Sequence, residues 1–131
     1  MIQRAIVRKN SRVREAAERH LTAMDIVRRP LLHALLGERT IRTVDVREIR
    51  FAPGQRTGRH LHPCTVIGYI ASGAAELEIE GQPVQLLPAG SAFHEPAGAV
   101  VARFDNASAS EPMTFIASYL LCGDEALIEL L

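Results

Sequence analysis

The most informative stretch of this 131-residue chain is Gly54-Gln55-Arg56-Thr57-Gly58-Arg59-His60-Leu61-His62-Pro63. Side chains of a strand alternate between its two faces, so His60 and His62 share one face if this stretch is extended. Two imidazoles that converge from one strand suit a divalent metal such as zinc, iron, nickel or manganese. A His-x-His pair is weak evidence when taken alone, because two surface histidines often occur by chance. The segments around the pair therefore decide how it is interpreted.

The segments on both sides of this stretch predict β-structure. Residues 40–51 predict a long strand that ends at Pro53-Gly54. Apolar residues alternate with glutamates over residues 75–80, which predicts a half-buried strand with a clear inward face. Gly81 marks a tight hairpin after it. Further strands are predicted at residues 66–71, 84–87, 91–95, 99–104 and 113–121. Many short strands separated by glycine and proline predict a β-sandwich or barrel.

Helix is predicted near the beginning of the chain. Ser11 is a candidate N-cap for a helix that runs to about Arg28. Its apolar side chains fall on one face, at Val13, Ala17, Leu21 and Met24. Pro30 ends or kinks this helix. The four leucines within residues 31–36 then predict one or two buried helical turns, which Gly37 closes.

A second, short helical turn is predicted over residues 124–131. The expected domain division is therefore an N-terminal helical arm over residues 1–37 and a β-rich barrel domain over residues 38–131. The arm is too short to be stable alone, so we expect it to pack on the barrel or on a second subunit.

Charge and composition exclude several classes of function. Lysine plus arginine and aspartate plus glutamate both number 15, so the net charge is zero and general nucleic-acid binding is not expected. The first 29 residues are basic, which fits a solvated helix face better than an arm for an anionic partner. Cys64 and Cys122 are too few for a disulfide framework. No apolar run approaches the roughly 20 residues that span a membrane, and no signal peptide is evident. A cytoplasmic protein without a membrane partner is expected.

Several of these residues resemble the two sequence motifs of the cupin superfamily, in the pattern of small bacterial type 2 cupins. The first motif has a glycine, a His-x-His pair, a glutamate and a second glycine at set spacings. Its glycine and histidine positions are matched by Gly54, His60, His62 and Gly73. The second motif is matched by Pro88-Ala89-Gly90 and by Asn106. The likeness covers roughly residues 31–121 and implies an all-β fold, the cupin double-stranded β-helix (jelly-roll) barrel.

The resemblance also implies a metal site, but the chain departs from the motifs at two ligand positions. The metal-binding glutamate of the first motif falls on Val66. The histidine of the second motif falls on Val101, or on Val100 if the register shifts by one residue. Valine cannot bind a metal, so the implied ligand set is reduced to His60 and His62.

Glu95 is the first candidate to complete this set. Small cupins that lack the first glutamate often keep a glutamate before a proline at this place, so the resemblance allows Glu95 as a ligand or as a partner of one. A carboxylate that caps a turn at the rim is an equally good interpretation. Phe93 is a predicted core residue, which places Glu95 on the inward face and His94 on the outward face.

Two further side chains are candidates for the interior. Cys64 has the same strand parity as the histidine pair and could offer a thiolate to zinc, but a small buried filler is the favoured interpretation. Tyr69 could offer its phenol to a ligand, although a strand aromatic more often serves packing. The predicted metal ligands are His60, His62 and Glu95, and Tyr69 is added for ligand binding.

Three functions are consistent with this pattern. The first is a metal-dependent oxidoreductase or isomerase of the cupin type, which binds a small organic molecule in the barrel. The second is a metal-free cupin, an epimerase-like catalyst in which a histidine acts as general base. The third is a binding or assembly module without catalysis. A homodimer is expected under all three, because cupin sheets commonly pair.

Overall fold

The computed structural model describes residues 26–131, and residues 1–25 lie outside the described part of the chain. The helix predicted from Ser11 to about Arg28 falls mostly outside it. Residues 31–131 form one compact unit. Its strands are β1 (Thr43–Phe51), β2 (His60–Leu61), β3 (Thr65–Ser72), β4 (Ala74–Ile79), β5 (Gln85–Pro88), β6 (Ala92–Glu95), β7 (Val100–Asn106), β8 (Met113–Leu121) and β9 (Glu129–Leu130).

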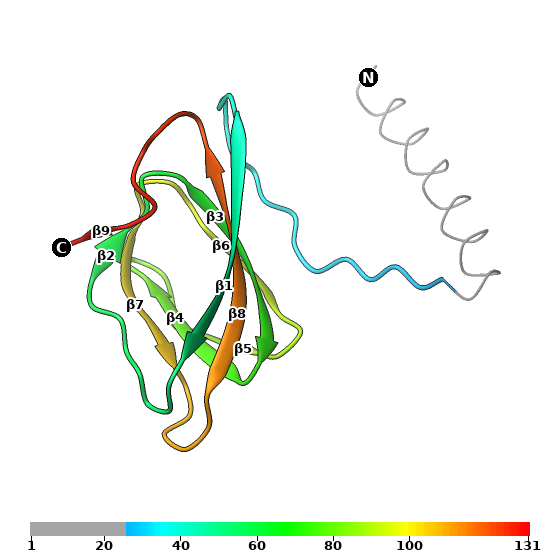
Figure 1. The fold of residues 1–131 in the computed structure, drawn as a ribbon, viewed down its shortest axis with the longest axis vertical. Coiled ribbons are helices and arrows are strands. Elements are labelled where there is room, and N and C mark those ends of the chain that lie inside the picture. Colours follow the sequence, from blue (N-terminus) through cyan, green and yellow to red (C-terminus); the bar gives the residue numbers. More distant parts are fainter. Residues whose placement is uncertain (1–25) are drawn as a thin grey trace. The chain divides into compact units, whose positions relative to one another are not determined.

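These strands form two antiparallel sheets (Figure 1). The first sheet has the order β1-β8-β3-β6, and the second has the order β5-β4-β7-β2-β9. Strands far apart in the sequence are therefore neighbours, such as β1 beside β8. The prediction of an all-β jelly-roll domain is confirmed. Within residues 26–131 no helix has the length and hydropathy needed to cross a lipid bilayer.

Strand β4 shows how the sequence pattern produces the inward face. Ala75, Leu77 and Ile79 are at most 5% exposed, and the glutamates between them point outward. Glu76 and Glu78 reach Arg103 of the neighbouring strand β7, at 3.4 and 3.2 Å. The alternation predicted for this segment is confirmed, because each apolar side chain faces the core and each charged one faces water.

The core lies between the two sheets and is rich in phenylalanine. Phe104 of β7 packs against Phe93 and Phe115 of the opposite sheet, with ring centroids 5.1 and 4.8 Å apart. Phe51 of β1 meets the edge of the Phe115 ring at 5.4 Å. Because aromatic rings bury large areas and pack at fixed distances, these four side chains hold the sheets at their spacing.

Two predicted helical turns are wrong. Residues 31–36 contain no helix, and Leu31, Leu32 and Leu35 are exposed. Residues 124–131 contain no helix either, and Glu129 and Leu130 form the short strand β9. Both segments are too short to form a stable helix without a packing partner, so tertiary contacts decide their conformation.

Candidate metal centre

Strand β2 and the residue after it place both histidines of the His-x-His pair inside the domain. β2 lies between β7 and β9, with His60 opposite Val101 on one side and Leu130 on the other. His60 is 2% exposed and His62 is 6% exposed. The two ring centroids are 5.1 Å apart, so the imidazoles lie side by side in the interior, as the two-residue spacing predicts.

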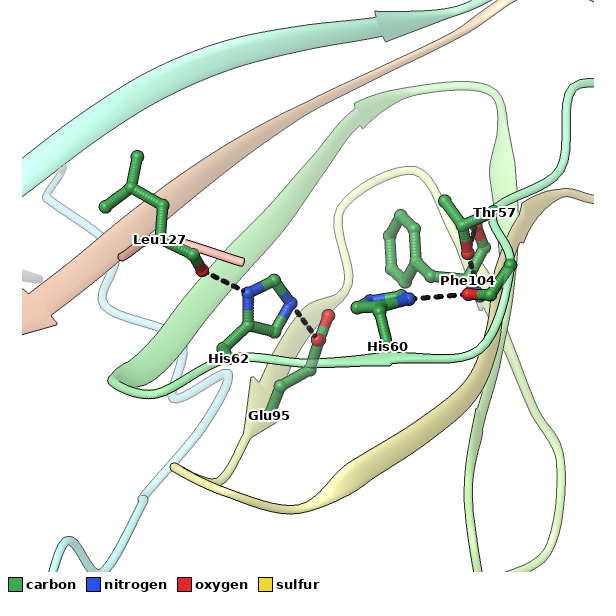
Figure 2. Close-up of polar contacts among 7 residues, drawn as sticks. Thr57, His60, His62, Glu95, Phe104 and Leu127 are labelled. Carbon is green, nitrogen blue, oxygen red and sulfur yellow. Dashed lines mark hydrogen bonds and ion pairs between the residues drawn. The ribbon is translucent and has the colours of Figure 1, made fainter. Parts of the chain in front are cut away.

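Both imidazoles are held by backbone carbonyls through the same ring atom. Nδ1 of His60 donates to the carbonyl oxygen of Gly58 at 2.7 Å. Nδ1 of His62 donates to the carbonyl oxygen of Leu127 at 2.6 Å (Figure 2). A carbonyl oxygen can only accept, so the proton of His60 lies on Nδ1. His62 has an acceptor beside each nitrogen, because Oε2 of Glu95 lies 2.8 Å from its Nε2. His60 therefore presents the lone pair of Nε2 when neutral, which is the form that binds a metal. In His62 a metal would take the place of a proton on Nε2.

Glu95 lies on β6 of the first sheet, whereas the histidine pair lies on and directly after β2 of the second sheet. Phe93 and Glu95 are buried on β6 and His94 points the other way, as predicted from their parity. In the pairing of β3 with β6, Glu95 lies directly opposite Val66. Val66 is the position where the first cupin motif carries its glutamate. On the inner surface of this sheet, the Glu95 carboxylate on β6 therefore lies beside the position that Val66 occupies on β3.

The donor atoms of this group fit a divalent metal. One ligand atom each from His60, His62 and Glu95 lie within 4.8 Å of one another. Nε2 of His62 is 2.8 Å from Oε2 of Glu95 (Figure 2). When a neutral His62 carries its proton on Nδ1, this buried Oε2 has no hydrogen-bond donor, and two lone pairs face each other. A cation or an extra proton on His62 removes this conflict. Two imidazoles and one carboxylate are the donor set of many catalytic zinc and non-haem iron sites.

The electrostatics of the site depend on Glu95. Burial lowers the pKa of His62, but the hydrogen bond to Glu95, its negative charge and the Leu127 carbonyl outweigh burial and raise the pKa above the usual 6.5. A proton therefore competes with a metal for Nε2. Burial and the charge of Glu95 both raise the pKa of the Tyr119 phenol, which stays protonated and can donate a hydrogen bond.

The three candidate ligands open into a cavity of about 220 Å³. Its walls are mainly apolar and aromatic. It is lined by Ile49, Phe51, Thr57, His60, His62, Val66, Phe93, Glu95, Phe104, Phe115, Ala117, Tyr119 and Ile128. The Thr57 hydroxyl is already engaged with the backbone of Phe104 (Figure 2). No lysine or arginine is among these described lining residues.

Tyr69 and Cys64 do not line this cavity. Tyr69 is 41% exposed on the outer face of β3, and Tyr119 of β8 supplies the phenol of the cavity instead. The alternation within residues 113–121 could have indicated Tyr119, since it shares the parity of Phe115. Cys64 is fully buried in the hydrophobic core, which confirms its interpretation as a filler. Burial raises the pKa of its thiol.

Two residues of the site were not indicated by any sequence pattern. Leu127 contributes only its backbone carbonyl to His62, and Ile128 lines the cavity beside it. A backbone carbonyl has no residue-type signature, and this contact spans 65 positions of the chain.

The comparisons with known proteins agree with the fold. A family model described as "Cupin domain" matches residues 47–119. A cupin-like protein from Thermotoga maritima is similar, with 25% identity, a TM-score of 0.58, and coverage of 67% of this chain and 64% of that one. A protein with a double-stranded β-helix domain from Klebsiella pneumoniae has 26% identity, a TM-score of 0.56, and coverage of 66% and 73%.

A third similar structure is the DMSP lyase DddQ from Ruegeria pomeroyi, with 24% identity, a TM-score of 0.57, and coverage of 66% of this chain and 42% of that one. The chain thus spans less than two thirds of the Thermotoga protein and less than half of the lyase. No curated protein sequence matches the chain. The likeness to the lyase concerns the fold alone.

Proposed function

Because this chain belongs to the cupin domain family, we propose that it is a metal-dependent cupin enzyme that acts on a small organic molecule inside its barrel. One observation carries the proposal. His60, His62 and Glu95 are buried, and their ligand atoms converge within 4.8 Å while both Nδ1 atoms are anchored to backbone carbonyls. These three side chains would hold the metal.

A bound divalent metal would supply Lewis acidity and open coordination positions for a ligand. The carbonyls of Gly58 and Leu127 orient the two imidazoles through Nδ1. The phenol of Tyr119 is placed to donate a hydrogen bond to a ligand in the cavity. The phenylalanine walls give the site an apolar surrounding, which strengthens electrostatic interactions inside it.

The cavity indicates the class of ligand. A volume of about 220 Å³ corresponds to roughly seven water molecules at liquid density. Its walls are largely apolar, and no lysine or arginine is among the described residues that line it. We therefore propose a small, mainly apolar molecule with one oxygen-bearing group that binds the metal directly. Oxidation or isomerisation of such a molecule is the proposed class of reaction.

Metal analysis of the full chain, purified without chelator, tests the proposal. We expect about one equivalent of zinc, iron, nickel or manganese, or uptake of one of them at micromolar concentration. At a metal concentration of 100 times Kd, binding stabilises a protein by about 2.7 kcal/mol. For a domain of this size that stabilisation raises Tm by about 10 °C. A protein that neither contains nor takes up any of the four metals would overturn the proposal.

A second candidate function is supported by the close contact between His62 and Glu95. A buried imidazole 2.8 Å from a carboxylate can serve as a general acid or base without a metal, as in an epimerase-like catalyst. Thermal-shift screening of small acids and sugars in the presence of EDTA separates the two functions. Stabilisation by a ligand in EDTA favours the metal-free function, whereas stabilisation only after a metal is added favours the metalloenzyme.

We also propose that the protein is a homodimer. The outer face of the first sheet exposes Val44, Val46 and Tyr69, and a sheet face that is apolar in water favours association. Light scattering at micromolar concentration is expected to give twice the mass of one chain, and the mass of a single chain would contradict the dimer.

A further inference from the structure

The outer faces of the two sheets differ in chemistry. On the second sheet, Glu76 and Glu78 of β4 point outward and pair with Arg103 of β7. Charged side chains of this kind are usual where the outer face of an antiparallel sheet meets water. The outward side chains of the first sheet are instead mostly aliphatic or aromatic. An apolar outer face of this kind marks a surface that another protein surface covers.

The strand register joins these apolar side chains across β1, β8 and β3. Val44 of β1 lies opposite Leu120 of β8, and Ile116 of β8 lies opposite Tyr69 of β3. Residues that lie opposite each other in antiparallel strands share one face of the sheet and are close neighbours there. We call six of these side chains the outer patch: Val44, Val46, Ile67, Tyr69, Ile116 and Leu120.

A second apolar surface precedes β1 in the chain. Residues 31–36 belong to the same compact unit as the barrel, and we call them the leucine segment. Leu31, Leu32 and Leu35 are exposed, and Leu35 is 84% exposed. Within residues 26–131 the structure shows no backbone hydrogen bond between this segment and any strand. One copy of the chain therefore leaves the leucine segment without a partner.

A second copy of the chain fits both surfaces. One chain exposes the outer patch and the leucine segment at the same time, so the segment does not cover its own patch. In a dimer with two-fold symmetry, the segment of each copy can cover the patch of the other, which buries both surfaces in both copies. A stable interface takes about 20–30 residues from each partner. The outer patch has only six apolar side chains, so the segment supplies contact area that the patch lacks.

Charge complementarity also favours the leucine segment as the occupant. Glu48 of β1 borders the outer patch, opposite Ile116. It takes part in none of the ion pairs that residues 26–131 form. Arg28 and Arg29 stand directly before the leucine segment in the sequence, two residues from its first leucine. A docked segment thus brings cations toward an unpaired carboxylate, which fixes the orientation of docking.

We propose that the leucine segment of one copy docks on the outer patch of a second copy, so that exchanged segments hold the dimer together. The proposal rests on the homodimer proposed above and says which two surfaces form it. It does not depend on the metal centre, which lies on the inner side of the sheets.

Two substitutions in the full chain test the two surfaces separately. Val46→Lys places a charge in the outer patch, and Leu35→Lys places one in the leucine segment. Each charge would be buried without a partner, and twice in the symmetric dimer, so we expect the Kd of the dimer to rise at least about 100-fold in either variant. Leu86→Lys is the matched control, because Leu86 is an exposed leucine on β5 of the second sheet. It should dimerise like the wild type.

Sedimentation equilibrium measures the Kd of each variant, and circular dichroism verifies that each is folded. All three substituted positions are exposed in one copy of the chain, so the fold should be retained. A wild-type Kd in either Val46→Lys or Leu35→Lys would overturn the proposal.

NMR of mixed copies shows whether the docked segment comes from the second chain. A nitroxide is attached to Glu38→Cys, two residues after the leucine segment, in chains without ¹⁵N. Cys122→Ala in the same chains removes the partly exposed native thiol, whereas Cys64 is fully buried. These chains are mixed with ¹⁵N-labelled wild type. We expect the amide signals of Ile67 and Tyr69 to broaden, and to stay sharp when the nitroxide is on Leu86→Cys instead.

The outcomes separate this proposal from the others. If the wild type sediments as a single chain, the homodimer and the exchanged segments both fail. If it is a dimer but Ile67 and Tyr69 stay sharp in the mixture, the exchange is refuted and the dimer stands. Broadening only in chains that carry both the nitroxide and ¹⁵N would show that the segment covers its own chain, which also refutes the exchange. None of these measurements uses a metal, so they leave the test of the proposed enzyme separate.

Discussion

Replacement of Glu95 by glutamine is expected to lower the affinity for a divalent metal by at least about 100-fold. Changes in groups that only hydrogen-bond to metal ligands already cost about 10–100-fold, and Glu95 is the one anionic member of the candidate ligand set. Isothermal titration with zinc or manganese measures the affinity. The metal-dependent rise in Tm expected for the wild type should disappear in the same variant.

The fold of the metal-free Glu95→Gln protein is expected to be intact. Oε2 of Glu95 is buried and has no hydrogen-bond donor when the proton of a neutral His62 lies on Nδ1, and the glutamine amide can instead donate to Nε2 of His62. We therefore expect the Tm of the metal-free variant within a few degrees of the wild type. Glu48→Gln, at an exposed position of β1, is the matched control and should bind metal normally. Wild-type affinity in Glu95→Gln would show that Glu95 is not a ligand.

Replacement of Gly68 by alanine is expected to destabilise the protein by about 3 kcal/mol or more. A Cβ at this position would lie 2.0 Å from Cζ of Phe93 and 2.3 Å from its Cε1. The ring cannot move freely, since Phe104 and Phe115 pack against it with centroids 5.1 and 6.2 Å away. Phe93 must shift, and Glu95 lies two residues along the same strand. We expect Tm to fall by about 10 °C and metal binding to weaken as well.

Gly58→Ala is the matched control for this substitution. No atom lies within 4 Å of a Cβ built at Gly58, and its backbone conformation is one that alanine adopts. Alanine there restricts the unfolded chain, so we expect a change of less than about 1 kcal/mol. Urea denaturation of both variants gives the two free energies of unfolding. Equal stabilities would contradict the close packing of Phe93 on Gly68. Partial recovery in Gly68→Ala/Phe93→Leu would support it, because the smaller side chain leaves room for the added methyl group.

The sequence could predict those parts of the site that depend on the alternation of side chains between the two faces of one strand. The two-residue spacing of His60 and His62 puts both rings on one side, and the parity of Phe93 indicates that Glu95 points inward. Both follow from the geometry of an extended chain and need no knowledge of distant strands. The strand at residues 113–121 was predicted with the bounds that β8 has in the structure, because its period of two is unbroken.

The helical turns predicted at residues 31–36 and 124–131 could not be judged in this way. Their apolar residues are compatible with helix, extended chain or strand, and the choice is made by the surfaces that the folded domain offers them. Residues 129–130 become a strand because β2 has a free edge beside them. Tyr69 was likewise assigned to the cavity although its strand turns it outward, and Tyr119 takes that place from another strand.

The sequence by itself therefore determined the all-β class, the family resemblance and the inward direction of His60, His62 and Glu95, since each depends on local patterns along the chain and not on which strands pair. The tertiary structure alone decided that Glu95 lies opposite Val66 and thus faces the histidines, because that depends on how β3 pairs with β6. It also decided which carbonyl holds His62. That acceptor is a backbone atom 65 residues away, and only the packing of the whole domain brings it to the ring.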